Sequence, residues 1–237
     1  MARDRDPCAL RLKSASIREF RPNYLWVRAV TGRSSRAPAK EDGIVASSDI
    51  QSQYPKQIRS TDGREFTIRL MEPTDADKAA IGAFAGRLNE DDLLYLRTDI
   101  TDPTVIAQWI HSLTTGNTTT LLAELHGEVA GYASVHREQA QWTRCVGELR
   151  VNAAHQFRGI GLGRALVAEV FNVGQRLGLK KLCGMLTSDQ NGARTAFERL
   201  GFRVEAALHD WVQDRRGRLR DILVLTYELD GFTDQGA

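Results

Sequence analysis

The segment of residues 145–186 constrains the fold more than any other part of this sequence. Residues 145–151 read as a strand and residues 182–186 as a buried strand, and residues 162–177 between them repeat their apolar positions on one helical face. A strand, a helix and a second strand in this order form a crossover that places the two strands parallel in one sheet. The sequence therefore predicts a domain that mixes helices with a sheet containing a parallel pair.

The loop before that helix has the composition of an anion-binding site. It reads Gln156-Phe157-Arg158-Gly159-Ile160-Gly161, and Gly163 follows in the first helical turn. Helix N-termini present unpaired N–H groups and about half a positive charge, and glycines let a backbone approach an anion closely. We expect the loop to hold a pyrophosphate; the alternative duty of its glycines is tight packing of the helix on the sheet. Neither a dinucleotide fingerprint after a first strand nor a P-loop Gly-Lys-Ser/Thr is present.

Other patterned segments predict further strands and helices. Phe66, Ile68 and Leu70 alternate with polar residues, which is the period of a half-buried strand. Thr74 and Asp102 are N-cap candidates for two helices. The remaining predictions are a hairpin of residues 119–125 and 129–136, a short helix over 191–200, and a last hairpin of 202–212 and 219–229.

Charge divides the chain unevenly. Residues 1–60 carry twelve Lys and Arg against six Asp and Glu, so their net charge is +6, whereas the whole chain has +2. Few apolar positions recur there, which predicts a basic and mostly disordered extension over 1–60, a folded domain over 61–230 and a tail over 231–237. A basic arm suits phosphates, but sparse aromatic residues favour a solvated tail and argue against nucleic acid as a partner.

Composition also bounds the cellular setting. The start of the chain offers no apolar stretch with a cleavage site, and no apolar run approaches the roughly 20 residues of a membrane span. Cys8, Cys145 and Cys183 are widely spaced, which fits neither a disulfide framework nor a zinc site. We therefore expect a cytoplasmic protein without membrane contact and without a metal.

From the glycine loop onward the sequence resembles the GCN5-related N-acetyltransferases, the GNAT family. Gln156, Gly159 and Gly161 match the signature Gln/Arg-x-x-Gly-x-Gly/Ala, and Ala196-Phe197-Glu198-Arg199-Leu200-Gly201-Phe202 is similar to a second motif. The resemblance covers about residues 61–230. It implies an α/β (α+β) fold with a central mixed, mostly antiparallel seven-stranded sheet and about four helices, splayed between the fourth and fifth strands.

The resemblance also implies a cofactor site for acetyl-CoA. The pantetheine arm would bond to the backbone near Val151, in the gap between the splayed strands. Asn191 matches an asparagine that approaches the cofactor, although a simple N-cap is its alternative role. Backbone groups of the loop would hold the pyrophosphate, and the residues concerned are Gln156, Phe157, Arg158, Gly159, Ile160, Gly161 and Leu162.

Transfer to an amine requires removal of a proton, since a lysine-like amine is mostly protonated at neutral pH. Glu148, three residues before Val151 on the same predicted strand, is the candidate base, and an ordinary exposed strand residue is the alternative. Asp189 and Asp210 are weaker candidates. Many relatives protonate the departing thiolate with a tyrosine, and the matching residue here is Phe197. No metal or covalent enzyme intermediate is required.

These features predict an N-acetyltransferase with an amine acceptor, a protein lysine first among the candidates. Residues 61–69 and 88–97 look like the catalytic domains of bacterial protein-lysine acetyltransferases. Two alternatives stay open. One is a small-molecule enzyme for amino acids or amine antibiotics, which requires a pocket closed by the first two helices and the last hairpin. The other is a non-catalytic acyl-CoA sensor. The sequence leaves the oligomeric state open, a homodimer included.

Overall fold

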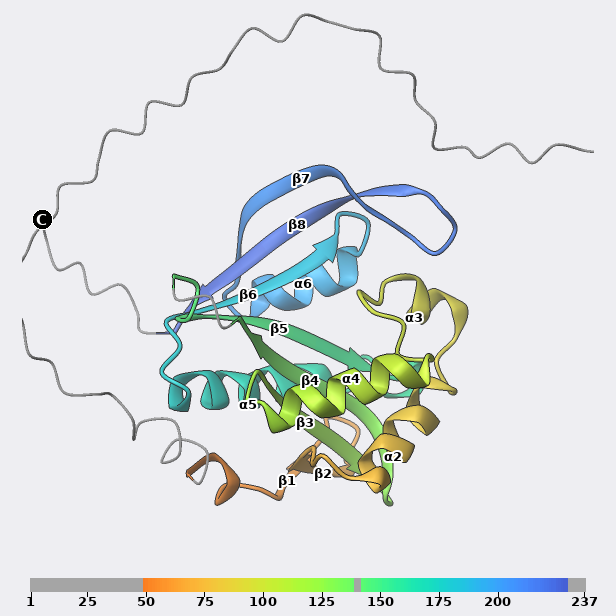
Figure 1. The fold of residues 1–237 in the computed structure, drawn as a ribbon, viewed down its shortest axis with the longest axis vertical. Coiled ribbons are helices and arrows are strands. Elements are labelled where there is room, and N and C mark those ends of the chain that lie inside the picture. Colours follow the sequence, from red (N-terminus) through yellow and green to blue (C-terminus); the bar gives the residue numbers. More distant parts are fainter. Residues whose placement is uncertain (1–48, 139–141, 230–237) are drawn as a thin grey trace, which may run out of the picture. The chain divides into compact units, whose positions relative to one another are not determined.

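The computed structural model describes residues 49–138 and 142–229, which form one sheet with helices on both faces (Figure 1). The strands are β1 (Lys56–Arg59), β2 (Glu65–Leu70), β3 (Thr118–Leu125), β4 (Glu128–Arg137), β5 (Val146–Ala153), β6 (Lys181–Thr187), β7 (Arg203–Gln213) and β8 (Leu219–Glu228). The helices are α2 (Asp75–Ala85), α3 (Glu90–Leu94), α4 (Pro103–Thr114), the 3-10 turn η1 (His155–Phe157), α5 (Leu162–Arg176) and α6 (Asn191–Arg199).

The sheet has eight strands in the order β1-β2-β3-β4-β5-β6-β8-β7. Only β5 and β6 run parallel, and every other neighbouring pair is antiparallel. The predicted mixed, mostly antiparallel sheet is therefore confirmed. The prediction of seven strands was one too few, because β1 lies within the segment that we expected to precede the domain.

β1 carries little sequence signal of its own. Its four residues, Lys56–Arg59, include a single apolar side chain, Ile58, which stands opposite Phe66 of β2. A strand so short and polar forms because the edge of β2 offers unpaired backbone groups, which a local pattern cannot reveal. The ordered structure thus begins before residue 61. Residues 1–48 and 230–237, the rest of the predicted extension and the tail, lie outside the described residues.

The two faces of the sheet are covered by different helices (Figure 1). Leu121 and Leu122 are neighbours on β3 and belong to separate apolar clusters, because successive side chains point to opposite faces. Leu121 packs in the cluster of α5, and Leu122 packs with α2 and α4. One face of the central strands is therefore sealed by α5, and the other lies under α2 and α4.

Helix starts follow the predicted caps. The Thr74 hydroxyl accepts a hydrogen bond from the Asp77 N–H at 3.2 Å, and the Asp102 carboxylate accepts one from the Thr104 N–H at 2.8 Å. α3 was not predicted, since five residues are too few to show a helical period, although Asn89 caps it by accepting from the Asp92 N–H at 2.7 Å. Within the described residues, no helix combines the length and the apolar character that a membrane span requires.

The parallel strands β5 and β6 separate soon after they meet. Their register pairs Val146 with Lys181, Gly147 with Leu182 and Glu148 with Cys183, and β5 then continues to Ala153 without β6 beside it. The expected splay is confirmed. It opens the sheet immediately after Glu148 and leaves the second half of β5 paired only with β4.

Candidate active site

The loop between β5 and α5 has the backbone conformation for which its glycines are suited. Gly159 has φ +74° and Gly161 has φ +85°, both in the left-handed region that side chains rarely adopt. A Cβ atom would meet nothing within 4 Å at Gly159 or Gly163, and at Gly161 it would meet only Thr61 Cγ2 at 3.5 Å. Tight helix packing therefore does not explain these glycines, whereas an exposed, sharply turned loop does.

The loop also leaves backbone donors unused. The N–H groups of Phe157 and Arg158 close the turn η1, donating to Ala154 and His155 at 2.8 and 3.2 Å. Within the described residues, the N–H groups of 159–162 have no hydrogen-bond partner, and Gly161 is the N-cap of α5 without a side chain to satisfy them. Such a run of donors at a helix N-terminus is suited to bind a phosphate.

Three separate parts of the chain hold this loop in place. The Thr61 N–H, in the turn between β1 and β2, donates to the Ile160 carbonyl at 3.0 Å. The Phe157 ring packs edge-on against Phe66 with 5.7 Å between centroids. Arg158 forms an ion pair of 2.6 Å with Asp92, whose side chain is buried. The Arg158 guanidinium thus anchors the loop to α3.

A cavity of about 260 Å³ lies against the loop and the first turn of α5. Arg59 from β1 and Arg164 from α5 line it, together with Thr61 and Gly161. Two guanidinium groups beside free N–H donors give this surface the positive charge that phosphate groups require.

The predicted pantetheine contact, Val151, lies in the part of β5 beyond the splay. Val151 stands opposite Ala133 of β4, while β6 has already diverged on its other side. Unlike Glu148, whose position still faces Cys183 of β6, Val151 borders the opening in the sheet.

Glu148 is held by two arginines. Its Oε1 accepts from Arg150 Nε at 2.8 Å, and its Oε2 lies 2.6 Å from Arg97 Nη1. Burial acts to raise the pKa of Glu148, but the hydrogen bond from Arg150 and the charges of Arg150 and Arg97 outweigh it and bring the pKa below its ordinary value. Glu148 is therefore ionised at neutral pH.

His136 of β4 stands directly opposite Glu148 in the sheet register. Its Nδ1 lies 3.1 Å from Thr118 Oγ1. Burial, reinforced by the positive charge of Arg150, lowers the pKa of His136 to about 4, so the imidazole is neutral at pH 7. The sequence alone gave no role to this histidine.

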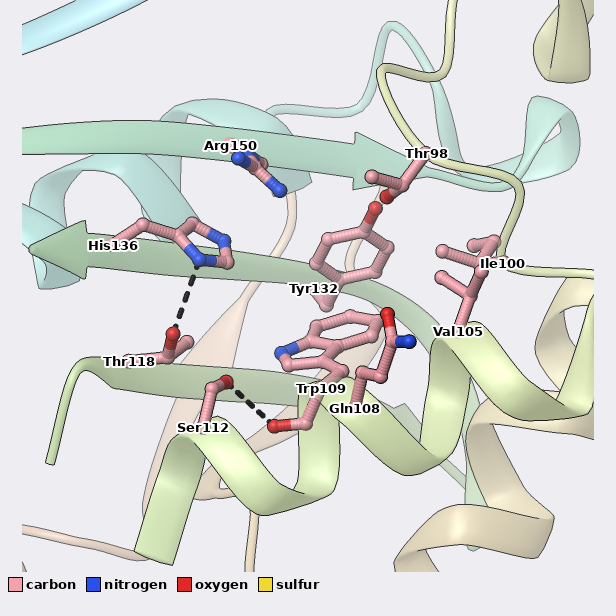
Figure 2. Close-up of a pocket in the computed structure, with 10 residues that line it drawn as sticks. All are labelled: Thr98, Ile100, Val105, Gln108, Trp109, Ser112, Thr118, Tyr132, His136 and Arg150. Atoms are coloured by element: carbon pink, nitrogen blue, oxygen red, sulfur yellow. Dashed lines mark hydrogen bonds between the residues drawn. The ribbon is translucent and has the colours of Figure 1, made fainter. Parts of the chain in front are cut away.

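Thr118, His136 and Arg150 border a cavity of about 190 Å³ under α4, which sequence reasoning did not foresee (Figure 2). Figure 2 shows Arg150 and His136 on neighbouring strands, facing Trp109 and Gln108 of α4. Its lining comes from α4, from the segment before it and from three strands: Thr98, Ile100, Val105, Gln108, Trp109, Ser112, Thr118, Tyr132, His136 and Arg150. The one available signal was the alternation of β5, which puts Arg150 on the same face as Glu148.

The segment around α3 is tied by ion pairs to the far side of the splay. Asp99 pairs with Arg215 of the last hairpin, and Asp91 lies 3.7 Å from Arg216. Asp189, after β6, accepts from Arg220 at 2.6 Å and from Tyr95 at 3.3 Å. Most of the hairpin arginines thus pair with acidic groups of this protein.

The other predicted residues are Asn191, Asp189 and Asp210. Asn191 is the first residue of α6 and not its N-cap, which is Gln190, and the Asn191 side chain is exposed. Asp189 is an ion-pair partner of Arg220, as described above, while Asp210 lies exposed on β7 at a break in the strand register. The capping alternative for Asn191 is therefore excluded, and neither aspartate lines the cavity under α4.

Phe197, at the position of the family tyrosine, is buried. Its ring packs edge-on against Phe202 with 4.9 Å between centroids, and Gly184 of β6 leaves the space for it. A Cβ at Gly184 would lie 3.0 Å from Phe197 Cε1.

Comparison with known proteins agrees with this geometry. Residues 85–202 match the model of the acetyltransferase (GNAT) family. The chain belongs to the GNAT acetyltransferase family. Its GNAT domain includes the glycine loop and the splayed strands, both of which the sequence predicted. No curated protein matches the sequence at a significant level.

Solved structures share this fold. The GNAT-family acetyltransferase from Streptococcus pneumoniae is 23% identical, with a TM-score of 0.59 over 69% of this chain and 99% of that one. yncA, a putative acetyltransferase from Salmonella typhimurium solved with its cofactor acetyl-CoA, is 24% identical, with a TM-score of 0.61 over 73% and 98%. The GNAT domain of S. lividans PAT is 17% identical, with a TM-score of 0.61 over 75% and 98%.

Proposed function

We propose that this protein transfers an acetyl group from acetyl-CoA to a primary amine by direct attack of the amine on the thioester. The observation that carries the proposal is the glycine loop with unpaired N–H groups at 159–162, placed at the end of the strand that splays from β6. The loop can bind the phosphate groups of a long cosubstrate. The opening between β5 and β6 beside it gives the reactive end of that cosubstrate a path through the sheet.

The cofactor contacts in this proposal divide between backbone and side chains. The N–H groups of 159–162 hold the pyrophosphate, within the predicted range Gln156–Leu162, and Arg59 and Arg164 supply positive charge beside it. Val151 borders the pantetheine arm, and the exposed amide of Asn191 is free to approach it. Acetyl-CoA supplies the thioester; the Val151 N–H is our candidate donor to its carbonyl oxygen as negative charge develops there.

Glu148 is our candidate general base. It is ionised and hydrogen-bonded, and its Oε2 is paired with Arg97, a side chain about half exposed. An acceptor ammonium can replace Arg97 at this oxygen, because one cation exchanges for another, and Glu148 then accepts its proton. The buried Phe197 offers no acid for the leaving group, which departs as a thiolate since a thiol has a pKa near 8.5.

A small-molecule acceptor is favoured over a protein lysine by one observation. The cavity under α4 is lined by Arg150, which is hydrogen-bonded to Glu148, and the α3 segment is connected to the last hairpin by ion pairs. The small-molecule hypothesis requires a pocket; this cavity supplies one with α4 as a wall, and the last hairpin contributes no residue to its lining. A protein lysine remains the alternative, and the panel below distinguishes the two.

The first experiment measures thiol release from acetyl-CoA with amino acids, polyamines, aminoglycosides and lysine peptides. We expect amine-dependent release that Glu148→Gln lowers by about 10²- to 10⁴-fold, the range of general-base catalysis. Glu128→Gln, which changes an exposed carboxylate at the start of β4, is the matched control. Retained acetyl-CoA binding without release for any amine would favour the sensor hypothesis, and full activity of Glu148→Gln would remove Glu148 as the base.

A further inference from the structure

The cavity under α4 points to a class of acceptor. We propose that it binds the acceptor, and that this acceptor is a small amine of the amino-acid type whose carboxylate pairs with Arg150. The inference rests on the proposed function and deepens it. It uses the side chains that line the cavity, which face it from α4 and from three neighbouring strands (Figure 2).

The charge of the cavity favours an anionic group. Of its ten lining residues, Arg150 alone is ionised near neutral pH, because His136 is kept neutral by burial. Beside the cavity, Arg97 and Arg150 carry two positive charges and Glu148 carries one negative charge, so the group has one net positive charge. A guanidinium at the edge of a partly apolar pocket is a common way to bind a carboxylate.

Arg150 is oriented for this role. Its Nε donates to Glu148 Oε1 at 2.8 Å, which fixes the plane of the guanidinium. Its two terminal nitrogens have no hydrogen-bond partner among the described residues. Figure 2 shows the side chain at the border of the cavity. Terminal N–H groups of an oriented guanidinium form a fork that matches the two oxygens of a carboxylate.

Glu148 and Arg150 together match the two ends of an amino acid. Both side chains project from the same face of β5, since they are two residues apart on one strand. A carboxylate at Arg150 therefore lies near an ammonium at Glu148, as in a molecule whose amine and carboxylate share one carbon atom. Val151, our candidate neighbour of the thioester, is the next residue along β5.

The remaining lining sets the size and polarity of the acceptor. Ile100, Val105, Trp109 and Tyr132 supply apolar walls. The volume of about 190 Å³ is below the roughly 300–1,000 Å³ of pockets for drug-sized ligands. Both features fit the apolar side chain of a single amino acid better than an aminoglycoside.

The test compares acceptors that differ only in the carboxylate. We would measure kcat/KM for leucine and phenylalanine and for their amides, with acetyl-CoA saturating. We expect the acids to be preferred by about 10- to 100-fold, which is typical of a charged hydrogen-bonded pair. The amino group of an amino acid and that of its amide differ in basicity. The decisive quantity is therefore the ratio of kcat/KM for the acid to kcat/KM for the amide, and how this ratio changes from wild type to variant.

Arg150→Gln should lower this ratio to within about threefold of one. Arg150→Lys should retain part of the preference for the acid, because a lysine keeps the positive charge but lacks the paired N–H groups of the guanidinium. Arg203→Gln, an exposed arginine on β7, is the control and should leave the ratio unchanged. A uniform loss of rate from disturbing Glu148 cancels in the ratio. An acid preference that survives Arg150→Gln would overturn the assignment.

A second variant tests the cavity itself. Val105→Phe adds bulk from the α4 side and should raise the acceptor KM about tenfold or more while leaving the acetyl-CoA KM unchanged. An unchanged acceptor KM would place the acceptor elsewhere. Turnover of lysine peptides without turnover of leucine or phenylalanine would overturn this inference alone, whereas no thiol release with any amine would overturn the proposed function with it.

Discussion

The two sides of the β5–β6 opening are built in different ways. The glycine loop is a continuous stretch, residues 156–163, and the groups that we propose bind the pyrophosphate are its backbone N–H groups. The cavity under α4 is assembled from side chains that range from Thr98 to Arg150 and come from five segments of the chain. The first site depends on local backbone conformation, while the second depends on how separate elements pack.

This difference determines how each side should respond to change. Backbone donors keep their identity in most substitutions and are sensitive mainly to φ and ψ. Side chains in a partly buried cavity depend on charge and desolvation, and so on pH. The loop should therefore respond most to changes in conformation, and the cavity to changes in protonation and charge.

The largest expected effect on stability tests the cavity side through pH. The pKa of His136 is lowered to about 4 in the folded protein, against about 6.5 when unfolded. The unfolded state therefore binds more protons between these values, and this contribution to stability, present above pH 6.5, is lost as the pH falls towards 4. We expect a loss of up to about 3 kcal/mol in unfolding free energy.

The measurement is denaturant unfolding of wild-type protein and His136→Gln at pH 7, 6, 5 and 4. The difference between the two should shrink or reverse as the pH falls, because only the wild type has this histidine to protonate. His111→Gln, an exposed histidine on α4, is the control. Parallel pH curves for wild type and His136→Gln would show that the cavity does not desolvate His136.

An intermediate effect tests the loop side with two glycines that are two residues apart. Gly161→Ala places a side chain at φ +85° and should cost about 1–2 kcal/mol, seen as lower stability and an acetyl-CoA KM raised up to about tenfold. Gly163→Ala lies in the first turn of α5, where a Cβ meets nothing, and should stabilise by about 0.5–1 kcal/mol. Equal effects of the two substitutions would contradict a conformational role for Gly161.

The smallest expected effect concerns the leaving group. Phe197→Tyr restores the family residue in a buried site, and we expect kcat to change by less than about threefold, because a thiolate leaves without an acid. Steady-state rates at saturating acetyl-CoA measure it, with thermal unfolding to detect a cost of burying the hydroxyl. A rise of tenfold or more would show that protonation of the thiolate limits the rate.

Much of the fold was predictable because its signals are local. The alternation of Phe66 and Ile68 predicted β2, and both side chains are fully buried. Thr74 and Asp102 predicted the starts of α2 and α4 by capping chemistry that operates within three residues. β1 and α3 were missed, because the first depends on the edge of a neighbouring strand and the second is too short to show a period.

The site was predictable in part for the same reason. The sequence predicted that Glu148 lies on a strand, three residues before Val151. It did not predict the two arginines that bind Glu148. Arg97 comes from a segment about fifty residues away, and its contact exists only after α3 packs beside the sheet. The ion pairs of Arg215 and Arg220 in the last hairpin likewise join segments that are distant in the sequence, so no local pattern predicts them.

The sequence by itself determined the loop, the strand-helix-strand unit and the family. Glycines at fixed spacing set a backbone conformation, and a helix N-terminus presents its donors wherever the helix is placed. Only the tertiary structure decided the cavity and its charge. Arg150 and His136 line one cavity because β4 and β5 pair in one register, and Trp109 lines it with them because α4 packs on that face. Contacts between distant segments depend on packing, which no local pattern encodes.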